Sequence, residues 1–215
     1  MAELLPLFLN LAGRDVVLVG AGRVAAGKLR QLLAAGARVR VVAPEIGDEI
    51  AGIARDSRHG ALQVDRRPFA PGDLDGAWLV VAAAPPDVNR RVADAADVRR
   101  MFVNAVDDPP NASAYLGGVV RRDGVTLAIS TSGEAPALAA LLREGLDALL
   151  PRDLGSWMTR ARTERIAWRR GGVPMDERKP RLLLALNDMY EAPAEPAVAS
   201  HATVPWLTGP EDSWL

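Results

Sequence analysis

The first hundred residues alternate between short apolar runs and stretches in which apolar positions recur every three or four residues. Residues 16–19 form a continuous apolar run, which is typical of a strand buried on both faces of a parallel sheet. Over residues 23–35 the apolar positions fall on one stripe at helical spacing, and Gly36 suits the end of such a helix. The stripe consists of Ala25, Leu29, Leu32 and Leu33.

The same two patterns repeat as far as residue 105. Further helices are expected at residues 45–55 and 87–96, and further strands at 38–43, 62–64, 78–82 and 101–105. Repeated β-α-β units of this length fold as a parallel sheet with helices on both faces. The sequence therefore predicts an α/β fold.

The pattern changes after residue 113. Two apolar-rich runs at 115–120 and 125–129 are joined by a short connection that contains Asp-Gly, which predicts a β-hairpin. A helix beginning near Pro136 follows, and two more helices are expected between residues 151 and 190, separated at 171–174. The helix after Pro136 carries Leu138, Leu141, Leu142, Leu146 and Leu149 on one face.

The composition removes several kinds of chemistry. With 49% hydrophobic and 25% charged residues and a formal net charge of −1, the 215-residue chain is typical of globular proteins and favours neither nucleic acid nor membrane as a partner. The absence of cysteine excludes thiol chemistry, and with His59 and His201 as the only histidines we expect no metal site held by the protein. There is no basic leader and no apolar run near the ~20 residues that cross a bilayer, so we expect a cytoplasmic location.

A motif of the form G-x-G-x-x-A spans residues 20–25, directly after the first strand and at the start of the first helix. In such a motif Gly20 permits a tight turn, Gly22 lets a pyrophosphate approach the backbone, and Ala25 keeps the helix close to the sheet. This predicts a Rossmann-type dinucleotide-binding domain; the alternative is a glycine turn that binds no nucleotide. Glu45 lies roughly 20 residues further on, near the position of a ribose-binding acid, so NAD is favoured over NADP.

Two common dehydrogenase mechanisms lack their residues. Neither Tyr115 nor Tyr190 is followed four residues later by a lysine, and the two histidines fall in a predicted loop and near the C-terminal end. Asp107 and Asp108 instead follow the fifth strand, at the edge where such sheets place their chemistry. A carboxylate here can act as a general base. The spacing by itself favours the alternative, in which these are turn residues before a proline.

Several segments, taken in order, resemble the precorrin-2 dehydrogenase and sirohydrochlorin ferrochelatase family, which includes the N-terminal module of the bacterial siroheme synthase. The resemblance extends over roughly residues 4–155 and depends on the joint order and spacing of the segments. The segments are residues 6–11, 19–25 with Lys28, 35–37, 41–45, 89–92, 104–107, 130–136 and 141–144.

The resemblance implies NAD-dependent oxidation of precorrin-2 to sirohydrochlorin on the way to siroheme. It implies that Arg23 and Val24 of the glycine loop bind NAD together with Pro44 and Glu45 at the end of the second strand, and that Asp107 is the catalytic aspartate. Members that also insert metal, a lyase activity, are thought to use this carboxylate to remove pyrrole protons. Ferrochelatase activity with Fe²⁺ or Co²⁺ as substrate therefore stays open.

A tetrapyrrole substrate rich in carboxylates needs cations and N–H donors around it. Thr131, Ser132 and Gly133 precede the start of a predicted helix, which suits a carboxylate, although the same residues are equally typical of a helix cap. Arginines on the helix after Trp157 are further candidates, but a charged helix face is more often only solvated.

The resemblance also implies a homodimer and an order of domains. We expect a Rossmann NAD-binding domain at 1–113, a dimerisation region of hairpin and helix at 114–150, a small helical domain at 151–191 and a loose tail at 192–215, without the methyltransferase half of the multifunctional enzyme. Two other functions stay open. One is a non-catalytic, NAD(H)-sensing dimeric module, and the other is dehydrogenation of an unrelated small substrate.

Overall fold

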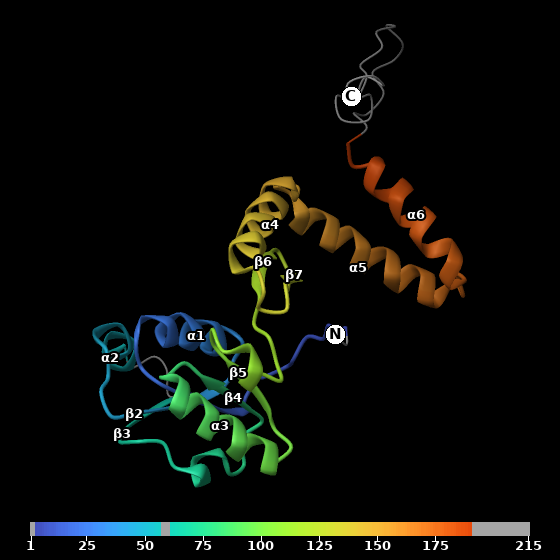
Figure 1. The fold of residues 1–215 in the computed structure, drawn as a ribbon. Coiled ribbons are helices and arrows are strands. Elements are labelled where there is room, and N and C mark those ends of the chain that lie inside the picture. The colour runs from blue at the N-terminus through green and yellow to red at the C-terminus, as the bar shows by residue number, and fades with distance from the viewer. Residues whose placement is uncertain (1–2, 57–60, 191–215) are drawn as a thin grey trace, which may run out of the picture. The chain divides into compact units, whose positions relative to one another are not determined.

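The computed structural model describes residues 3–56 and 61–190 (Figure 1). The expected tail, His59 and His201 lie outside the described residues. Contacts divide the chain into two units: the first runs as far as Val120 and resumes at Thr126–Leu149, and the second comprises Arg121–Val125 and the chain from Leu150. This division cuts through the expected hairpin, and the four-part domain organisation stays a prediction.

Five parallel strands form the sheet, in the order β3-β2-β1-β4-β5. The prediction of an α/β fold with a parallel sheet is confirmed. Trp78, expected inside the fourth strand, lies just before it. Its backbone N–H donates to the Asp15 carbonyl at 2.8 Å. Its side chain is exposed, and the Arg14 guanidinium lies over the indole ring, 4.0 Å from the ring centroid. The strands are β1 (Asp15–Val19), β2 (Arg38–Ala43), β3 (Leu62–Arg66), β4 (Leu79–Ala82) and β5 (Phe102–Ala105).

Helices cover both faces of this sheet (Figure 1). Along β1, Val16 and Leu18 pack with α1 and α2, whereas Val17 and Val19 pack with α3 on the other face. All four side chains are at most 3% exposed, and full burial of a side chain of this size contributes about 1.5–3 kcal/mol. The continuous apolar run is thereby explained, because both sides of the strand are core. The helices are α1 (Arg23–Ala34), α2 (Asp48–Arg55) and α3 (Pro86–Val98).

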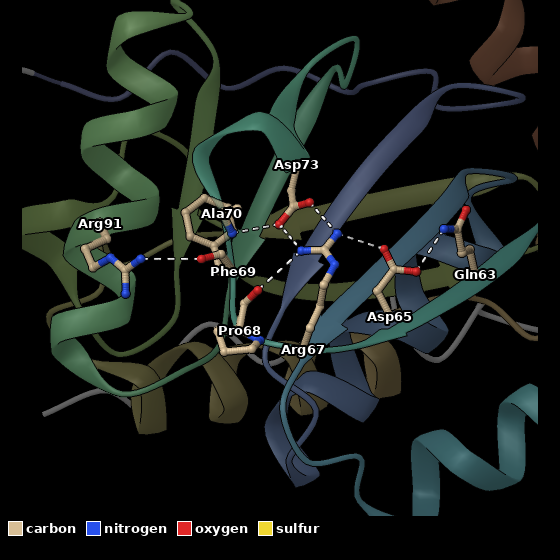
Figure 2. A network of polar contacts seen from close by, with 8 residues as sticks. All are labelled: Gln63, Asp65, Arg67, Pro68, Phe69, Ala70, Asp73 and Arg91. Carbon is tan, nitrogen blue, oxygen red and sulfur yellow. Dashed lines mark hydrogen bonds and ion pairs between the residues drawn. The ribbon is translucent and has the colours of Figure 1, made fainter.

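A network of charged groups around Arg67 holds the connection between β3 and β4 (Figure 2). The Arg67 guanidinium donates to both carboxylate oxygens of Asp73, at 2.6 and 2.8 Å, and to Asp65 at 3.0 Å. Asp73 also accepts the Ala70 N–H at 2.8 Å, where the short 3₁₀ helix η1 (Pro71–Leu74) begins. The hydrogen bond from Arg67 holds the pKa of Asp73 below its usual value, although burial of this carboxyl group opposes the shift.

The expected hairpin consists of β6 (Gly118–Arg122) and β7 (Val125–Ile129). Its turn is shorter than the sequence predicts, since Arg121 and Arg122 belong to β6 and only Asp123 and Gly124 connect the strands. Both turn residues have positive φ, 49° and 87°, as a type I′ turn requires. The helix α4 (Pro136–Leu149) follows.

The second unit contains the two long helices that the sequence predicts after residue 151. They are α5 (Leu154–Arg170) and α6 (Met175–Asn187). The Tyr190 hydroxyl accepts the Trp157 Nε1–H and donates to Asp153, each at 2.5 Å, which ties the end of the described chain to the start of α5. In the part of the chain that the structure describes, none of the helices is long and apolar enough to cross a membrane.

Candidate active site

The loop between β1 and α1 has the geometry of a phosphate-binding turn. Gly20 has a φ of 104°, and a Cβ atom there would lie 2.1 Å from the Ala83 carbonyl oxygen, so no larger residue fits. At Gly22 a Cβ atom would meet nothing within 4 Å. Ala25 is fully buried where α1 packs on the sheet. Gly20 therefore serves the packing of the protein itself, whereas Gly22 leaves open space for a ligand.

The N-terminus of α1 is available to an anion. Gly22 is its N-cap, no side chain caps the helix, and the first turn holds no acidic residue. Arg23 and Val24 are exposed at this end. The free N–H groups of the first turn and the positive end of the helix dipole therefore face solvent, which fits the pyrophosphate of a dinucleotide.

The segment after β2 lies against the glycine loop. The Gly47 N–H donates to the Ala21 carbonyl at 3.1 Å, and a Cβ atom at Gly47 would lie 2.8 Å from that oxygen. This contact keeps the chain extended up to Asp48, so the prediction that α2 begins at residue 45 is wrong by three residues. Pro44 and Glu45 are exposed beside the loop, as ribose-binding residues need to be.

Asp107 and Asp108 differ in what binds their carboxylates. Asp107 is exposed at a positive φ of 56°, and its carboxylate forms no hydrogen bond or ion pair with a described residue. Asp108 accepts two contacts from the Asn111 side-chain amide, at 2.9 and 3.0 Å. The Asp108 carboxylate is thus bound within the protein, at the start of the short 3₁₀ helix η2 (Pro109–Asn111), whereas the Asp107 carboxylate at the turn has no such partner; the catalytic role of Asp107 stays a prediction.

The end of β4 lies between the glycine loop and the Asp107 turn. Gly20 approaches the Ala83 carbonyl, and the Val106 N–H donates to the Ala82 carbonyl at 2.8 Å. Because β1, β4 and β5 are neighbours in a parallel sheet, both turns come to the same carboxyl edge. Residues 20 and 107 therefore belong to one region of the surface.

Two polar side chains near this edge, those of Asn104 and Lys28, belong to the segments that resemble the family, but the sequence by itself predicts no role for either of them. Asn104 is 5% exposed; its amide nitrogen donates to the Ala114 carbonyl at 2.9 Å, while its buried Oδ1 accepts no hydrogen bond from the described residues. Lys28 is half-buried on α1, and its Nζ donates to the Leu116 carbonyl at 3.4 Å. Burial lowers the pKa of Lys28, and the nearby Asp107 carboxylate partly offsets this effect. Hydrophobic patterning signals neither arrangement.

The loop predicted to bind a substrate carboxylate, residues 131–133 (the cradle below), uses part of its hydrogen-bonding capacity within the protein. The Thr131 hydroxyl oxygen accepts the Ala135 N–H at 3.3 Å, a hydrogen bond within the loop that precedes α4. Ser132 and Gly133 have positive φ values of 55° and 80° and are exposed. The Thr131 hydroxyl oxygen is therefore engaged within the loop, although its O–H remains able to donate, and Ser132 is the freer hydroxyl; the substrate-binding role of this loop stays a prediction.

The cradle lies next to the Asp107 turn. A Cβ atom at Gly133 would lie 3.3 Å from Pro109 Cγ and 3.6 Å from Tyr115 Cε1. Pro109 follows Asp107 by two residues, so the loop at 131–133 and the candidate base share a neighbourhood. The structure thus places the 131–133 loop beside the turn that carries Asp107, 24 residues earlier in the sequence. A separate hollow of about 310 Å³ at the amino edge of the sheet is lined by none of the predicted site residues.

The parallel sheet and glycine loop define a dinucleotide-binding protein of the Rossmann type. Residues 7–118 match the family described as putative NAD(P)-binding, and residues 122–149 match the family described as sirohaem biosynthesis protein central. The chain belongs to this NAD(P)-binding family, and the shorter match to the sirohaem biosynthesis family agrees with the resemblance of its sequence. The predictions of that family and of a nicotinamide dinucleotide cofactor are confirmed.

The relatives agree with this assignment. The chain is 45% identical over 155 residues to siroheme synthase 3 of Aeromonas hydrophila, which covers 72% of this chain and 32% of the relative, and 45% identical over 154 residues to siroheme synthase 1 of Cronobacter sakazakii, covering 71% and 32%. It therefore spans about a third of the length of these relatives. Among solved structures, SirC, described as a precorrin-2 dehydrogenase, matches with a TM-score of 0.67 and 25% identity, covering 87% of this chain and 92% of that one.

Proposed function

We propose that the protein oxidises precorrin-2 to sirohydrochlorin with NAD as the hydride acceptor. The observation that carries the proposal is the exposed, unpaired Asp107 carboxylate at the same sheet edge as the open Gly22 turn. The likeness to SirC, a precorrin-2 dehydrogenase, supports the choice of substrate, as does the siroheme synthase identity of the relatives.

NAD would lie along the carboxyl edge of the sheet. The pyrophosphate would accept hydrogen bonds from backbone N–H groups at the start of α1, those of Arg23, Val24 and Ala25. Gly20 and Gly22 would shape the turn. Pro44 and Glu45 would border the adenosine ribose, and the Glu45 carboxylate, which repels a 2′-phosphate, favours NAD over NADP. When bound, NAD supplies the hydride acceptor.

Asp107 would act as the general base. Oxidation removes one hydride and one proton from the macrocycle, and the proton needs an acceptor near the reacting carbon or nitrogen. A carboxylate without internal partners is able to take it and release it to solvent. In a metal-inserting reaction, the same group would accept pyrrole N–H protons while Fe²⁺ or Co²⁺ enters as substrate.

Thr131, Ser132 and Gly133 would bind a carboxylate of the tetrapyrrole. Their exposed loop lies beside Pro109 and so within reach of the Asp107 turn. Hydroxyl and N–H donors at a helix start suit an anion that the positive helix end also attracts.

We also propose a homodimer formed through the hairpin and α4. The outward face of α4 is apolar and exposed, a feature that marks interaction surfaces in globular proteins. A second copy would cover this face and continue the contact along the hairpin. The exposed side chains are Leu138, Leu141, Leu142, Leu146 and Leu149.

The decisive experiment mixes the purified protein anaerobically with precorrin-2 and NAD and follows the absorption spectrum. Conversion to the sirohydrochlorin spectrum with stoichiometric NADH is the expected result, and subsequent addition of Fe²⁺ or Co²⁺ reports chelation separately. A protein that binds NAD but leaves precorrin-2 unchanged would contradict the proposal and favour the NAD(H)-sensing module.

A further inference from the structure

Lys28 lies where the cofactor helix meets the segment that follows Asp107. It occupies the second turn of α1, and its Nζ contacts the carbonyl of Leu116, 88 residues away in sequence. Side chains on a helix lean toward its N-terminus. The ammonium therefore leans toward the glycine loop and the carboxyl edge of the sheet, where Asp107 also lies.

This ammonium is poorly satisfied by the described residues. A lysine ammonium has three N–H donors, and here one of them reaches a carbonyl oxygen at 3.4 Å, a long hydrogen bond. Lys28 forms no ion pair within residues 3–56 and 61–190, and its charge interacts with Asp107 only at longer range. A half-buried cation with unused donors is costly unless an anion completes it.

The rest of the chain makes this residue unusual. Only two of the 26 cationic residues are lysines, Lys28 and Lys179, and Lys179 is exposed on α6. Many of the described arginines are matched with carboxylates: Arg30 on the same helix, for example, pairs with Glu49 at 2.7 Å. Lys28, whose charge interacts with that of the candidate base, thus has no such ion-pair partner among the described residues.

We propose that Lys28 binds a carboxylate of the tetrapyrrole. The assignment rests on the proposed function, since it takes the substrate to be the anion that completes the site. An acetate or propionate group would receive two N–H donors from Lys28, while the Leu116 carbonyl holds the third. The macrocycle would then be anchored on α1 from one side, with Asp107 close to the atoms that lose protons.

The test compares Lys28→Met and Lys28→Arg with the matched control Lys179→Met, using sirohydrochlorin as the probe. Fluorescence titration in saturating NAD should give about tenfold weaker sirohydrochlorin binding for Lys28→Met, as expected for a lost charge-assisted hydrogen bond. Lys28→Arg should retain most of the affinity, and Lys179→Met all of it. NAD affinity and melting temperature should stay within error, which separates loss of a ligand contact from loss of structure.

A second measurement uses the wild-type protein, so its result does not depend on whether the variants fold. Acylation of amines with NAD present throughout, read by mass spectrometry, should modify both lysines, and sirohydrochlorin should protect Lys28 but not Lys179. Equal labelling of Lys28 with and without sirohydrochlorin, or equal loss of binding in both Met variants, would overturn the assignment. If the wild type neither binds sirohydrochlorin nor oxidises precorrin-2, the proposed function fails instead.

Discussion

Two acidic turns of the same sheet use their aspartates in opposite ways. After β3, Asp73 is 6% exposed and its carboxylate is bound by the Arg67 guanidinium and the Ala70 N–H. After β5, Asp107 is exposed and has no hydrogen-bonded or ion-paired partner among the described residues. The first aspartate is satisfied within the protein and holds a connection in place. The second is left for a ligand.

The same division extends to residues of one type at other points of the edge. Gly20 is packed against the Ala83 carbonyl and Gly22 faces open space, and the Thr131 hydroxyl oxygen accepts the Ala135 N–H whereas the Ser132 side chain is exposed. A group with internal partners should affect stability when it is replaced, and a group without them should affect binding or turnover. Three of the pairs below test this rule with one substitution on either side of it, and the pair at Asp73 and Asp75 compares two carboxylates that both have internal partners.

The largest effect is expected for Asp107→Asn. Asparagine accepts the positive φ of this position as readily as aspartate does, so the backbone should keep its conformation. Loss of the general base should lower the rate of precorrin-2 oxidation by about 10²–10⁴-fold, with NAD affinity and melting temperature unchanged. Anaerobic absorption assays, which follow the conversion of precorrin-2 with time, measure the rate of oxidation.

The matched control is Asp108→Asn, because Asp108 is a neighbour whose carboxylate is already engaged by Asn111. It should change turnover by less than about threefold and stability by less than about 1 kcal/mol. Equal losses of turnover in the two variants would mean that the turn, and not the free carboxylate, matters.

The two glycines of the motif should separate stability from binding. In Gly20→Ala the new Cβ atom would collide with a carbonyl oxygen at a φ of 104°, so the free energy of unfolding should fall by more than about 2 kcal/mol. Gly22→Ala meets no protein atom and should melt near the wild-type temperature, but the methyl group should obstruct the pyrophosphate and weaken NAD binding about tenfold or more. Thermal melts and NAD titration of both variants would refute the distinction if Gly22→Ala bound NAD normally.

The sequence predicts the elements of the fold and the glycine loop better than it predicts the bounds of individual helices and the side-chain contacts. The apolar runs and the glycine motif are enough to predict the sheet, its helices and the loop that binds phosphate, because burial on two faces leaves a continuous apolar signal. The start of α2 was predicted too early, since the contact of Gly47 with Ala21 that delays the helix joins residues far apart in sequence. The difference in hydrogen-bond partners between Asp107 and Asp108 likewise depends on one side chain, that of Asn111, and the spacing of the residues does not predict it.

The Arg67 network should contribute to stability but not to catalysis. Asp73→Asn leaves Asp65 as the carboxylate partner of the Arg67 guanidinium, and because Arg67 is also partly exposed the loss should be about 1–2 kcal/mol in the free energy of unfolding. The control Asp75→Asn breaks the exposed pair with Arg99 and should cost less than about 1 kcal/mol. Urea unfolding at neutral pH measures both, and unchanged turnover is expected in each.

The pH dependence of this difference has a definite sign. The pKa of Asp73 is lowered in the folded protein from its ordinary value of 3.8, so the stabilisation is present above about pH 4 and is lost as pH falls through the lowered pKa. The gap in stability between wild type and Asp73→Asn should therefore be constant from pH 7 to 5 and shrink below pH 4. A gap that grew on acidification would contradict the role of the ionised carboxylate.

The smallest effects are expected at the loop before α4. Thr131→Val removes the oxygen that accepts the Ala135 N–H and should lower the free energy of unfolding by about 1 kcal/mol, as the loss of one intramolecular hydrogen bond does. Ser132→Ala removes an exposed hydroxyl without such a partner, so melting should be unchanged while sirohydrochlorin binding weakens a fewfold. If Thr131→Val weakened sirohydrochlorin binding more than Ser132→Ala did, the Thr131 hydroxyl, which has an internal hydrogen-bond partner, would also be the one that binds the ligand. An internal partner would then not distinguish structural from ligand-binding groups at this end of the site.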